Sequence, residues 1–182
     1  MSSVQSGSSS NIAFVFPGQG SQAVGMGLDL YQGSKAAKAV FDEVDEALGS
    51  NVSKIFFEGP EDELRKTVNT QPGIMTVSLA CLATMKEILG SDMMPVPALV
   101  AGHSLGEYSA LVSCGVLSFK DALKIIKIRA SEMQQSGKIN PGGMLAILGA
   151  TKEQIKELCD ATEILVPANY NSDEQIVLSG SK

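Results

Sequence analysis

Aromatic side chains and histidine are scarce in this chain of 182 residues. Aromatic residues make up 5% of it, tryptophan is absent and there is one histidine. Apolar residues nevertheless reach 44%, so we expect a sizeable core built from Leu, Ile, Val, Ala and Met. The single histidine matters for chemistry, because it restricts the choice of a catalytic base.

Positively charged residues are fewer than negatively charged ones, and long apolar runs are absent from the sequence. The formal net charge is −6, which argues against sequence-independent binding of nucleic acid. No apolar run approaches the length of a membrane span, and no basic segment followed by an apolar stretch opens the chain. We therefore expect a soluble, non-secreted protein that binds neither nucleic acid nor a membrane.

The cysteines, Cys81, Cys114 and Cys159, are odd in number and widely spaced along the chain. Their neighbours are apolar or helical, and their spacing does not match a metal site. We expect reduced core thiols in a reducing compartment, and no bound metal.

Composition divides the chain into three parts. Residues 1–10 are rich in Ser and Gly, which predicts a disordered tail. Residues 11–139 carry long helical patterns and two short apolar runs. After the break at Asn140-Pro141-Gly142-Gly143, residues 140–182 have a compact β-α-β-β pattern. We expect an α/β fold with a second, smaller subdomain that begins at residue 140.

Apolar periodicity predicts the individual helices and strands. Strands are expected near residues 12–16, 98–101, 144–148, 164–166 and 175–178, and helices over 34–48, 61–69, 72–89, 118–135 and 151–159. Pro72 is expected to open the third of these helices, since proline is tolerated in a first turn. Ser118 and Thr151 are followed three residues later by Asp and Gln, which predicts a capping box at each.

The segment Gly102-His103-Ser104-Leu105-Gly106 has the form Gly-x-Ser-x-Gly, with an apolar run before it and a helix-compatible run after it. This pattern is typical of a nucleophile elbow, a tight strand-to-helix turn that holds a serine at the end of a sheet. Glycine is needed on both sides because a Cβ there would meet the neighbouring backbone. Ser104 is therefore the candidate nucleophile.

A serine nucleophile needs a base and donors for the oxyanion. The N–H of Leu105, at the start of the following helix, is one candidate donor. The N–H of Gln19 is the other, because Gly18-Gln19-Gly20 follows the first strand and glycines allow a close approach. The same loop also fits a structural turn or, through Gly18-x-Gly20-x-x-Ala23, a loose dinucleotide fingerprint. The carboxylates some twenty residues on fall inside a helix, which argues against that fingerprint.

Two further polar residues lie near this motif in the sequence. His103 adjoins Ser104, but neighbours in a tight turn point their side chains apart, so we expect a supporting role and not the role of base. Arg129, on the next long helix, fits either a solvated helix charge or a bidentate clamp on a carboxylate. No other histidine is left to act as a base for Ser104.

Taken together, four segments resemble the malonyl-CoA:acyl-carrier-protein transacylase family, in the same order and at similar spacing. They are Pro17-Gly18-Gln19-Gly20-Ser21-Gln22, Gly102-His103-Ser104-Leu105-Gly106-Glu107-Tyr108, Arg129 with Met133-Gln134, and Asn169-Tyr170-Asn171-Ser172. The resemblance runs from Ile12 to the end of the chain. It implies an α/β-hydrolase-like large subdomain and a ferredoxin-like small subdomain, both incomplete here.

The resemblance also implies ping-pong acyl transfer. Malonyl-CoA is the substrate, and malonyl passes through a serine ester to the phosphopantetheine thiol of acyl carrier protein, for fatty-acid or polyketide synthesis. Ser104 would be the nucleophile, the N–H groups of Gln19 and Leu105 the oxyanion hole, and Arg129 the partner of the malonyl carboxylate. His103 and Asn169 would lie by the substrate.

The same resemblance sets expectations for partners and location. It implies acyl carrier protein and coenzyme A as partners, no bound cofactor, and a monomer when the protein is complete. The compartment would be the bacterial cytoplasm, or the stroma of a plastid or other organelle.

The chain departs from the family pattern in length. The family's catalytic histidine lies downstream of the Asn-x-Asn segment and has no counterpart here, so we expect an N-terminal part that is inactive alone. Two other readings stay open: a serine thioesterase or other hydrolase that passes the acyl group to water, and a non-catalytic piece that binds carrier protein. Replacing Arg129 separates the first from a transacylase, and acylation of Ser104 by malonyl-CoA separates the second.

Overall fold

The structure, a computed structural model, describes residues 11–181, so the expected tail at residues 1–10 lies outside the described residues. The chain divides into two compact units, Met1–Glu132 and Met133–Lys182. The elements follow in the order β1 (Ala13–Phe16), α1 (Leu28–Gly33), α2 (Lys35–Leu48), α3 (Val52–Glu58), α4 (Glu61–Leu64), α5 (Thr67–Leu89), the 3-10 turn η1 (Ser91–Met93), β2 (Leu99–Gly102), α6 (Gly106–Ser113), α7 (Phe119–Ile139), β3 (Gly142–Leu148), α8 (Lys152–Asp160), β4 (Leu165–Tyr170) and β5 (Gln175–Ser181).

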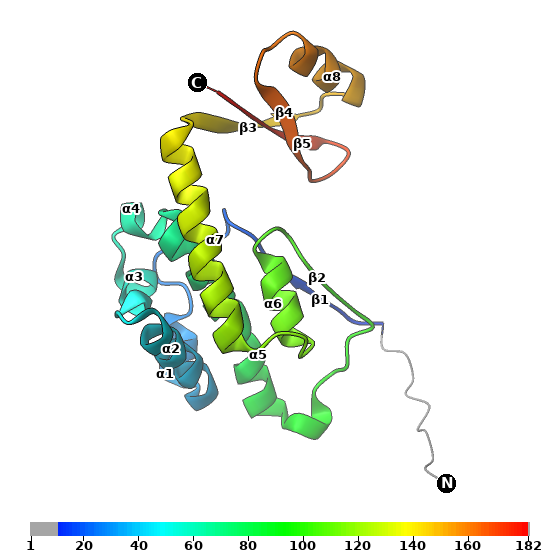
Figure 1. The fold of residues 1–182 in the computed structure, drawn as a ribbon. Helices are drawn as coiled ribbons and strands as arrows, with labels where there is room; N and C mark the ends of the chain where they lie inside the picture. The colour runs from blue at the N-terminus through cyan, green and yellow to red at the C-terminus, as the bar shows by residue number, and fades with distance from the viewer. Residues whose placement is uncertain (1–10, 182) are drawn as a thin grey trace. The chain divides into compact units, whose positions relative to one another are not determined.

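Two parallel strands, β1 and β2, position the site in the first unit. They pair in register from Ala13 opposite Leu99 to Phe16 opposite Gly102, so their carboxyl ends lie at the same edge. Helix α6 begins a few residues after β2 and packs against both strands, as Figure 1 shows for the green and dark-blue segments. The loops that follow β1 and β2 are thereby brought side by side.

A helical layer supplies most of the core of the first unit. Helix α2 begins where the Ser34 hydroxyl accepts a hydrogen bond from the Ala37 N–H at 3.0 Å, and ends at Gly49, which has a φ of 71°. One face of α2 is fully buried against α5, as the predicted periodicity of 34–48 requires. The largest fully buried apolar side chains of this core are Phe41, Val44, Phe56, Leu64, Met75, Leu105, Leu123 and Ile126.

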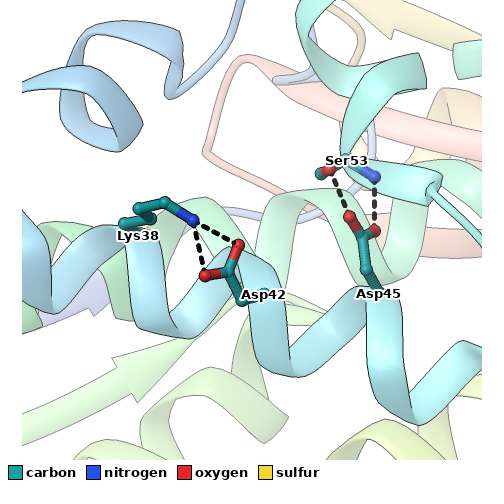
Figure 2. Close-up of polar contacts among 4 residues, drawn as sticks. All are labelled: Lys38, Asp42, Asp45 and Ser53. Atoms are coloured by element: carbon teal, nitrogen blue, oxygen red, sulfur yellow. Dashed lines mark hydrogen bonds and ion pairs between the residues drawn. The ribbon is translucent and has the colours of Figure 1, made fainter.

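The junction between α2 and α3 is held by a carboxylate. Asp45 accepts hydrogen bonds from the backbone N–H of Ser53 at 2.8 Å and from its hydroxyl at 2.6 Å. Figure 2 shows this pair beside Lys38 and Asp42, an exposed i,i+4 ion pair on α2. The carboxylate of Asp45 thus satisfies an N–H in the first turn of α3, whereas the pair of Lys38 and Asp42 lies on the surface of a single helix.

Helix α5 differs from its prediction, because it begins at Thr67 and contains Pro72 in its interior. The expectation that Pro72 opens the helix, and that a separate helix runs to residue 69, is therefore wrong. The extra turn is anchored by the side chain of Asn69 on the Glu63 carbonyl at 2.8 Å and by the Thr70 hydroxyl on the Leu64 carbonyl. These bonds and the burial of Thr70 outweigh the backbone hydrogen bond that proline removes.

By length and composition alone, α5 could cross a membrane, which the sequence analysis did not anticipate. In this structure it is a core helix, with nine buried residues between Thr70 and Ala80. Buried helices of this kind are apolar nearly all round.

The second unit contains an antiparallel sheet in the order β3-β5-β4 and the helix α8. The capping box predicted at Thr151 is confirmed, since its hydroxyl accepts from the Gln154 N–H and the Gln154 side chain accepts from the Thr151 N–H. A small core forms under the helix from Ile155, Ile176 and Leu178. The two units divide after Glu132, inside α7, and the expected break at residue 140 directly follows the end of that helix at Ile139.

The other predicted cap, at Ser118, is made differently. Its hydroxyl accepts from the Asp121 N–H at 3.1 Å and donates to the Asp121 carboxylate at 2.7 Å. The aspartate side chain is shorter than the glutamate or glutamine of a capping box and reaches the hydroxyl.

The cysteines are free, but two of them are not core residues as expected. Cys81 and Cys114 are exposed and Cys159 is half-buried. Apolar neighbours in the sequence did not ensure burial: Cys81 lines an open apolar groove between β1 and α5, and Cys114 directly follows the last residue of α6.

Candidate active site

The turn between β2 and α6 holds Ser104 in a strained conformation. Ser104 has a φ of 52° and is the one non-glycine residue with positive φ among the described residues. Two backbone hydrogen bonds close the turn, from the Gly106 N–H to the His103 carbonyl at 2.9 Å and from the Glu107 N–H to the Ser104 carbonyl at 3.2 Å. Strain of this kind persists only where the surrounding structure imposes it, and it is common at functional sites.

The flanking glycines are required by contact with backbone. A Cβ on Gly102 would lie 2.0 Å from the carbonyl carbon of Gly106, and a Cβ on Gly106 would lie 2.2 Å from the Phe16 carbonyl oxygen. Neither neighbour is a side chain that could move aside. The geometry is that of the strand–turn–helix which the Gly-x-Ser-x-Gly pattern predicts.

The loop after β1 lies against this turn. A Cβ on Gly18 would be 2.6 Å from the His103 carbonyl oxygen and 2.8 Å from its Nδ1, and the His103 N–H donates to the Phe16 carbonyl at 3.0 Å. Gln19 follows directly and is exposed, and its side chain amide donates to the Thr67 hydroxyl at 3.4 Å. The structure thus brings the loop of Gln19 next to the turn of Ser104.

Both candidate oxyanion donors have N–H groups available. Over residues 11–181, neither Gln19 nor Leu105 donates its backbone N–H to a protein acceptor. Leu105 is the residue before α6, and its side chain is fully buried. This burial fixes the backbone from which its N–H projects at the positive end of the helix.

Arg129 reaches the nucleophile from α7. Its Nη2 donates a hydrogen bond to the Ser104 hydroxyl oxygen at 3.0 Å, and its side chain is half-buried. The alternative of a solvated helix charge does not describe this contact. The arrangement puts a guanidinium, a good ligand for a carboxylate, beside a serine hydroxyl.

Asn169 belongs to the other unit, where it lies half-buried on β4 beside a bulge between Pro167 and Asn169. Its role near a substrate stays a prediction.

Sequence reasoning missed the contribution of Tyr108, whose ring lies under the Arg129 guanidinium. The position of Tyr108 one helical turn after Ser104 was the available signal.

An apolar groove of about 470 Å³ lies elsewhere in the first unit, between β1 and α5. Phe14, Phe16 and Ile74 line it, and Ser104 and Arg129 do not. No group of three or more metal-binding side chains gathers among the residues that the structure describes. The candidate chemistry therefore centres on the exposed turn at Ser104.

Comparison with known families assigns residues 13–182 to a model described as the acyl transferase domain. The malonyl CoA-acyl carrier protein transacylase of Bacillus subtilis strain 168 is 47% identical over 176 residues, which are 94% of this chain and 54% of that protein. The protein of the same name from Escherichia coli K12 is 40% identical over 173 residues, 93% of this chain and 55% of its own. The chain therefore spans about half the length of the curated relatives that it matches.

Solved structures agree. The acyl-carrier-protein-S-malonyltransferase of Bartonella henselae matches with a TM-score of 0.86 and 43% identity, over 93% of this chain and 55% of that one. A type II polyketide acyl-carrier protein in complex with its malonyl-transacylase matches with a TM-score of 0.83 and 39% identity, over the same shares of the two chains. The fold is thus the α/β fold of these enzymes, with mixed helices and sheets.

Proposed function

Since this chain belongs to the acyl transferase domain family, we propose that it provides the nucleophile of a malonyl-CoA:acyl-carrier-protein transacylase. The observation that carries the proposal is the hydrogen bond of 3.0 Å from Arg129 to the Ser104 hydroxyl. It puts a binding group for a carboxylate beside a nucleophile on an elbow, which suits an acyl group that carries its own carboxylate. Relatives with this name, 40–47% identical, support the same reading.

In the proposed reaction, Ser104 Oγ attacks the thioester carbonyl of malonyl-CoA while its proton passes to a base, which later gives that proton to the leaving thiolate of coenzyme A. The carbonyl oxygen becomes an oxyanion that the N–H groups of Gln19 and Leu105 stabilise, and Arg129 holds the malonyl carboxylate. The C–S bond then breaks, and coenzyme A leaves as a protonated thiol. The phosphopantetheine thiol of acyl carrier protein attacks the ester in turn, forms the new thioester and returns the proton to Ser104.

The base is the part of this reaction that the chain does not supply. Its one histidine, His103, adjoins Ser104 in the turn, and its carbonyl is used in a backbone hydrogen bond with Gly106. We assign His103 a supporting role by the substrate and expect the base to come from sequence beyond these 182 residues. Removing the base from a serine nucleophile costs orders of magnitude in rate.

We extend the proposal to architecture. Residues 11–139 would be the N-terminal part of an α/β-hydrolase-like subdomain, supported by the parallel β1–β2 pair and the elbow. Residues 140–182 would begin a ferredoxin-like subdomain, supported by the antiparallel order β3-β5-β4 with α8. Asn169, which lies on β4 of that subdomain, keeps its proposed role in substrate binding.

Partners and location follow from the reaction. The complete protein would act as a monomer on acyl carrier protein and coenzyme A thioesters, without a bound cofactor, metal, nucleic acid or membrane. The solved complex of an acyl-carrier protein with its malonyl-transacylase supports this choice of partner. A bacterial cytoplasm or an organelle stroma remains the proposed compartment.

The test is acylation of Ser104 in the full-length protein that contains this chain. After incubation with malonyl-CoA and acid quenching, peptide mass spectrometry should find malonyl on Ser104, and added acyl carrier protein should remove it. Ser104→Ala should abolish the adduct. The matched control Ser113→Ala, at the end of the helix α6 that follows this turn, should keep it, because the Ser113 hydroxyl donates to the Ala110 carbonyl within the helix. Acylation that persists in Ser104→Ala contradicts the proposal.

A further inference from the structure

The ring of Tyr108 lies against the guanidinium of Arg129. The Cζ of Arg129 is 5.7 Å from the centre of the ring, within the distance at which a cation and an aromatic face attract each other. Tyr108 is half-buried and packs against the main core, and its N–H donates to the Leu105 carbonyl at 3.0 Å in the first turn of α6. The ring is therefore a fixed surface, attached to the same turn that carries the nucleophile.

Arg129 needs such a surface because little else holds it. A guanidinium has five N–H donors, and one contact to a side-chain acceptor is found for it, the Ser104 hydroxyl. Within residues 11–181 no carboxylate forms an ion pair with it. A long side chain that must adopt one geometry to bind a ligand loses affinity when it is free to move.

We propose that Tyr108 is the positioning residue for Arg129, and so sets the preference of the site for acyl groups that carry a carboxylate. The ring supports one face of the guanidinium beside Ser104 and leaves its other N–H groups directed to the ligand. This inference rests on the proposed function and adds to it the residue that keeps the arginine in place.

The first experiment compares Tyr108→Leu with Tyr108→Phe in the full-length protein. We measure kcat/KM for acylation of Ser104 by malonyl-CoA and by acetyl-CoA, which has no carboxylate. Tyr108→Leu should lower the value for malonyl-CoA roughly tenfold, mainly through KM, and change the value for acetyl-CoA less than about twofold. Tyr108→Phe keeps the aromatic face and should behave as the wild type with both substrates.

A double variant tests whether the effect passes through the arginine. In an Arg129→Ala background, Tyr108→Leu should cause no further loss with malonyl-CoA, since there is no guanidinium left to hold. Equal losses with both substrates, a Phe variant as impaired as the Leu variant, or additive losses in the double variant would each overturn the proposal.

The second experiment does not depend on turnover. The Nε–Hε resonance of Arg129 in a ¹⁵N–¹H NMR spectrum should be shifted upfield by the ring in the wild type and in Tyr108→Phe, and the shift should vanish in Tyr108→Leu. If the shift is absent from the wild type, the positioning role is wrong even where malonyl is transferred. If the shift is present and the wild type transfers no malonyl, the proposed function is wrong, and the preference assigned to Tyr108 is overturned with it.

Discussion

The turn at Ser104 and the helical layer of α2, α3 and α5 use serine in opposite ways. In the layer, the Ser34 hydroxyl accepts from the Ala37 N–H and donates to Glu87, and the Ser53 hydroxyl donates to Asp45. These hydroxyls form hydrogen bonds that stabilise helix ends. In the turn, the Ser104 hydroxyl is exposed and accepts from Arg129, a residue that can itself bind a ligand.

The backbones of the two regions differ in the same sense. In the layer, the side chains of Ser34 and Asp45 accept N–H groups in the first turns of α2 and α3, so these donors are satisfied within the layer. The turn relies on glycines in contact with backbone and on a serine at positive φ. We expect substitutions in the layer to change stability, and substitutions in the turn to change the proposed acyl transfer.

The largest effect is expected from Gly102→Ala. Its new Cβ would lie 2.0 Å from backbone atoms of Gly106, so the turn must open, at a cost of more than about 3 kcal/mol in the free energy of unfolding. Urea unfolding checks stability, and acylation of Ser104 should be lost. Gly33→Ala is the control, because nothing lies within 4 Å of a Cβ at Gly33. Equal stability of the two variants would contradict this view of the turn.

A smaller loss is expected in the layer from Asp45→Ala. Two hydrogen bonds to Ser53 disappear and an N–H at the start of α3 loses its acceptor, which should cost about 1–2 kcal/mol of unfolding free energy. Acylation of Ser104 should be unchanged at temperatures where the variant is folded. Asp42→Ala, which removes the exposed pair with Lys38 drawn in Figure 2, should leave the urea midpoint nearly unchanged.

Ser104→Gly should increase the stability of the protein. Glycine adopts positive φ without the steric cost that serine meets at 52°, so the unfolding free energy should rise by about 1 kcal/mol while acyl transfer is abolished. The same change in the interior of a helix, Ser78→Gly in α5, should lower stability instead. Thermal unfolding of both variants measures whether each substitution raises or lowers stability. A loss of stability in Ser104→Gly would show that the turn is not strained.

The smallest effect concerns pH. Hydrogen bonds from the Ser34 hydroxyl and the Ala36 N–H hold the pKa of the Glu87 carboxyl below its ordinary value of 4.5. Because the folded-state pKa is the lower one, the contribution of Glu87 is complete above the unfolded pKa and is lost as pH falls through the folded pKa. Urea midpoints at pH values from 7 downward should therefore converge for the wild type and Glu87→Gln below about 4.5. If the difference between the two urea midpoints did not change with pH, the ionised Glu87 carboxylate would contribute nothing to stability.

The sequence predicted much of this arrangement where a local pattern has one physical solution. The face of α2 with Ala37, Phe41 and Val44 followed from helical periodicity, and the cap at Thr151 from its spacing to Gln154. The start of α5 was missed, because apolar periodicity does not register the side-chain hydrogen bonds from Asn69 and Thr70 to carbonyls six residues earlier. The exposure of Cys81 and Cys114 was also missed, since neighbours in sequence do not decide which side chains are covered.

By itself, the sequence determined the form of the turn at the candidate site. Glycine at positions 102 and 106 with serine at position 104, between a strand and a helix, is the pattern of one kind of tight turn, the nucleophile elbow. The sequence also determined that the chain has one histidine, His103, which adjoins Ser104.

Only the tertiary structure decided which distant residues meet at that turn. Parallel pairing of β1 with β2 brings the Gln19 loop to the elbow, and the packing of α7 directs Arg129 to Ser104 and onto the ring of Tyr108. Helical periodicity left Arg129 undecided between solvent and site. Its direction depends on how α7 packs against neighbouring elements far away in the sequence, and no local pattern contains that information.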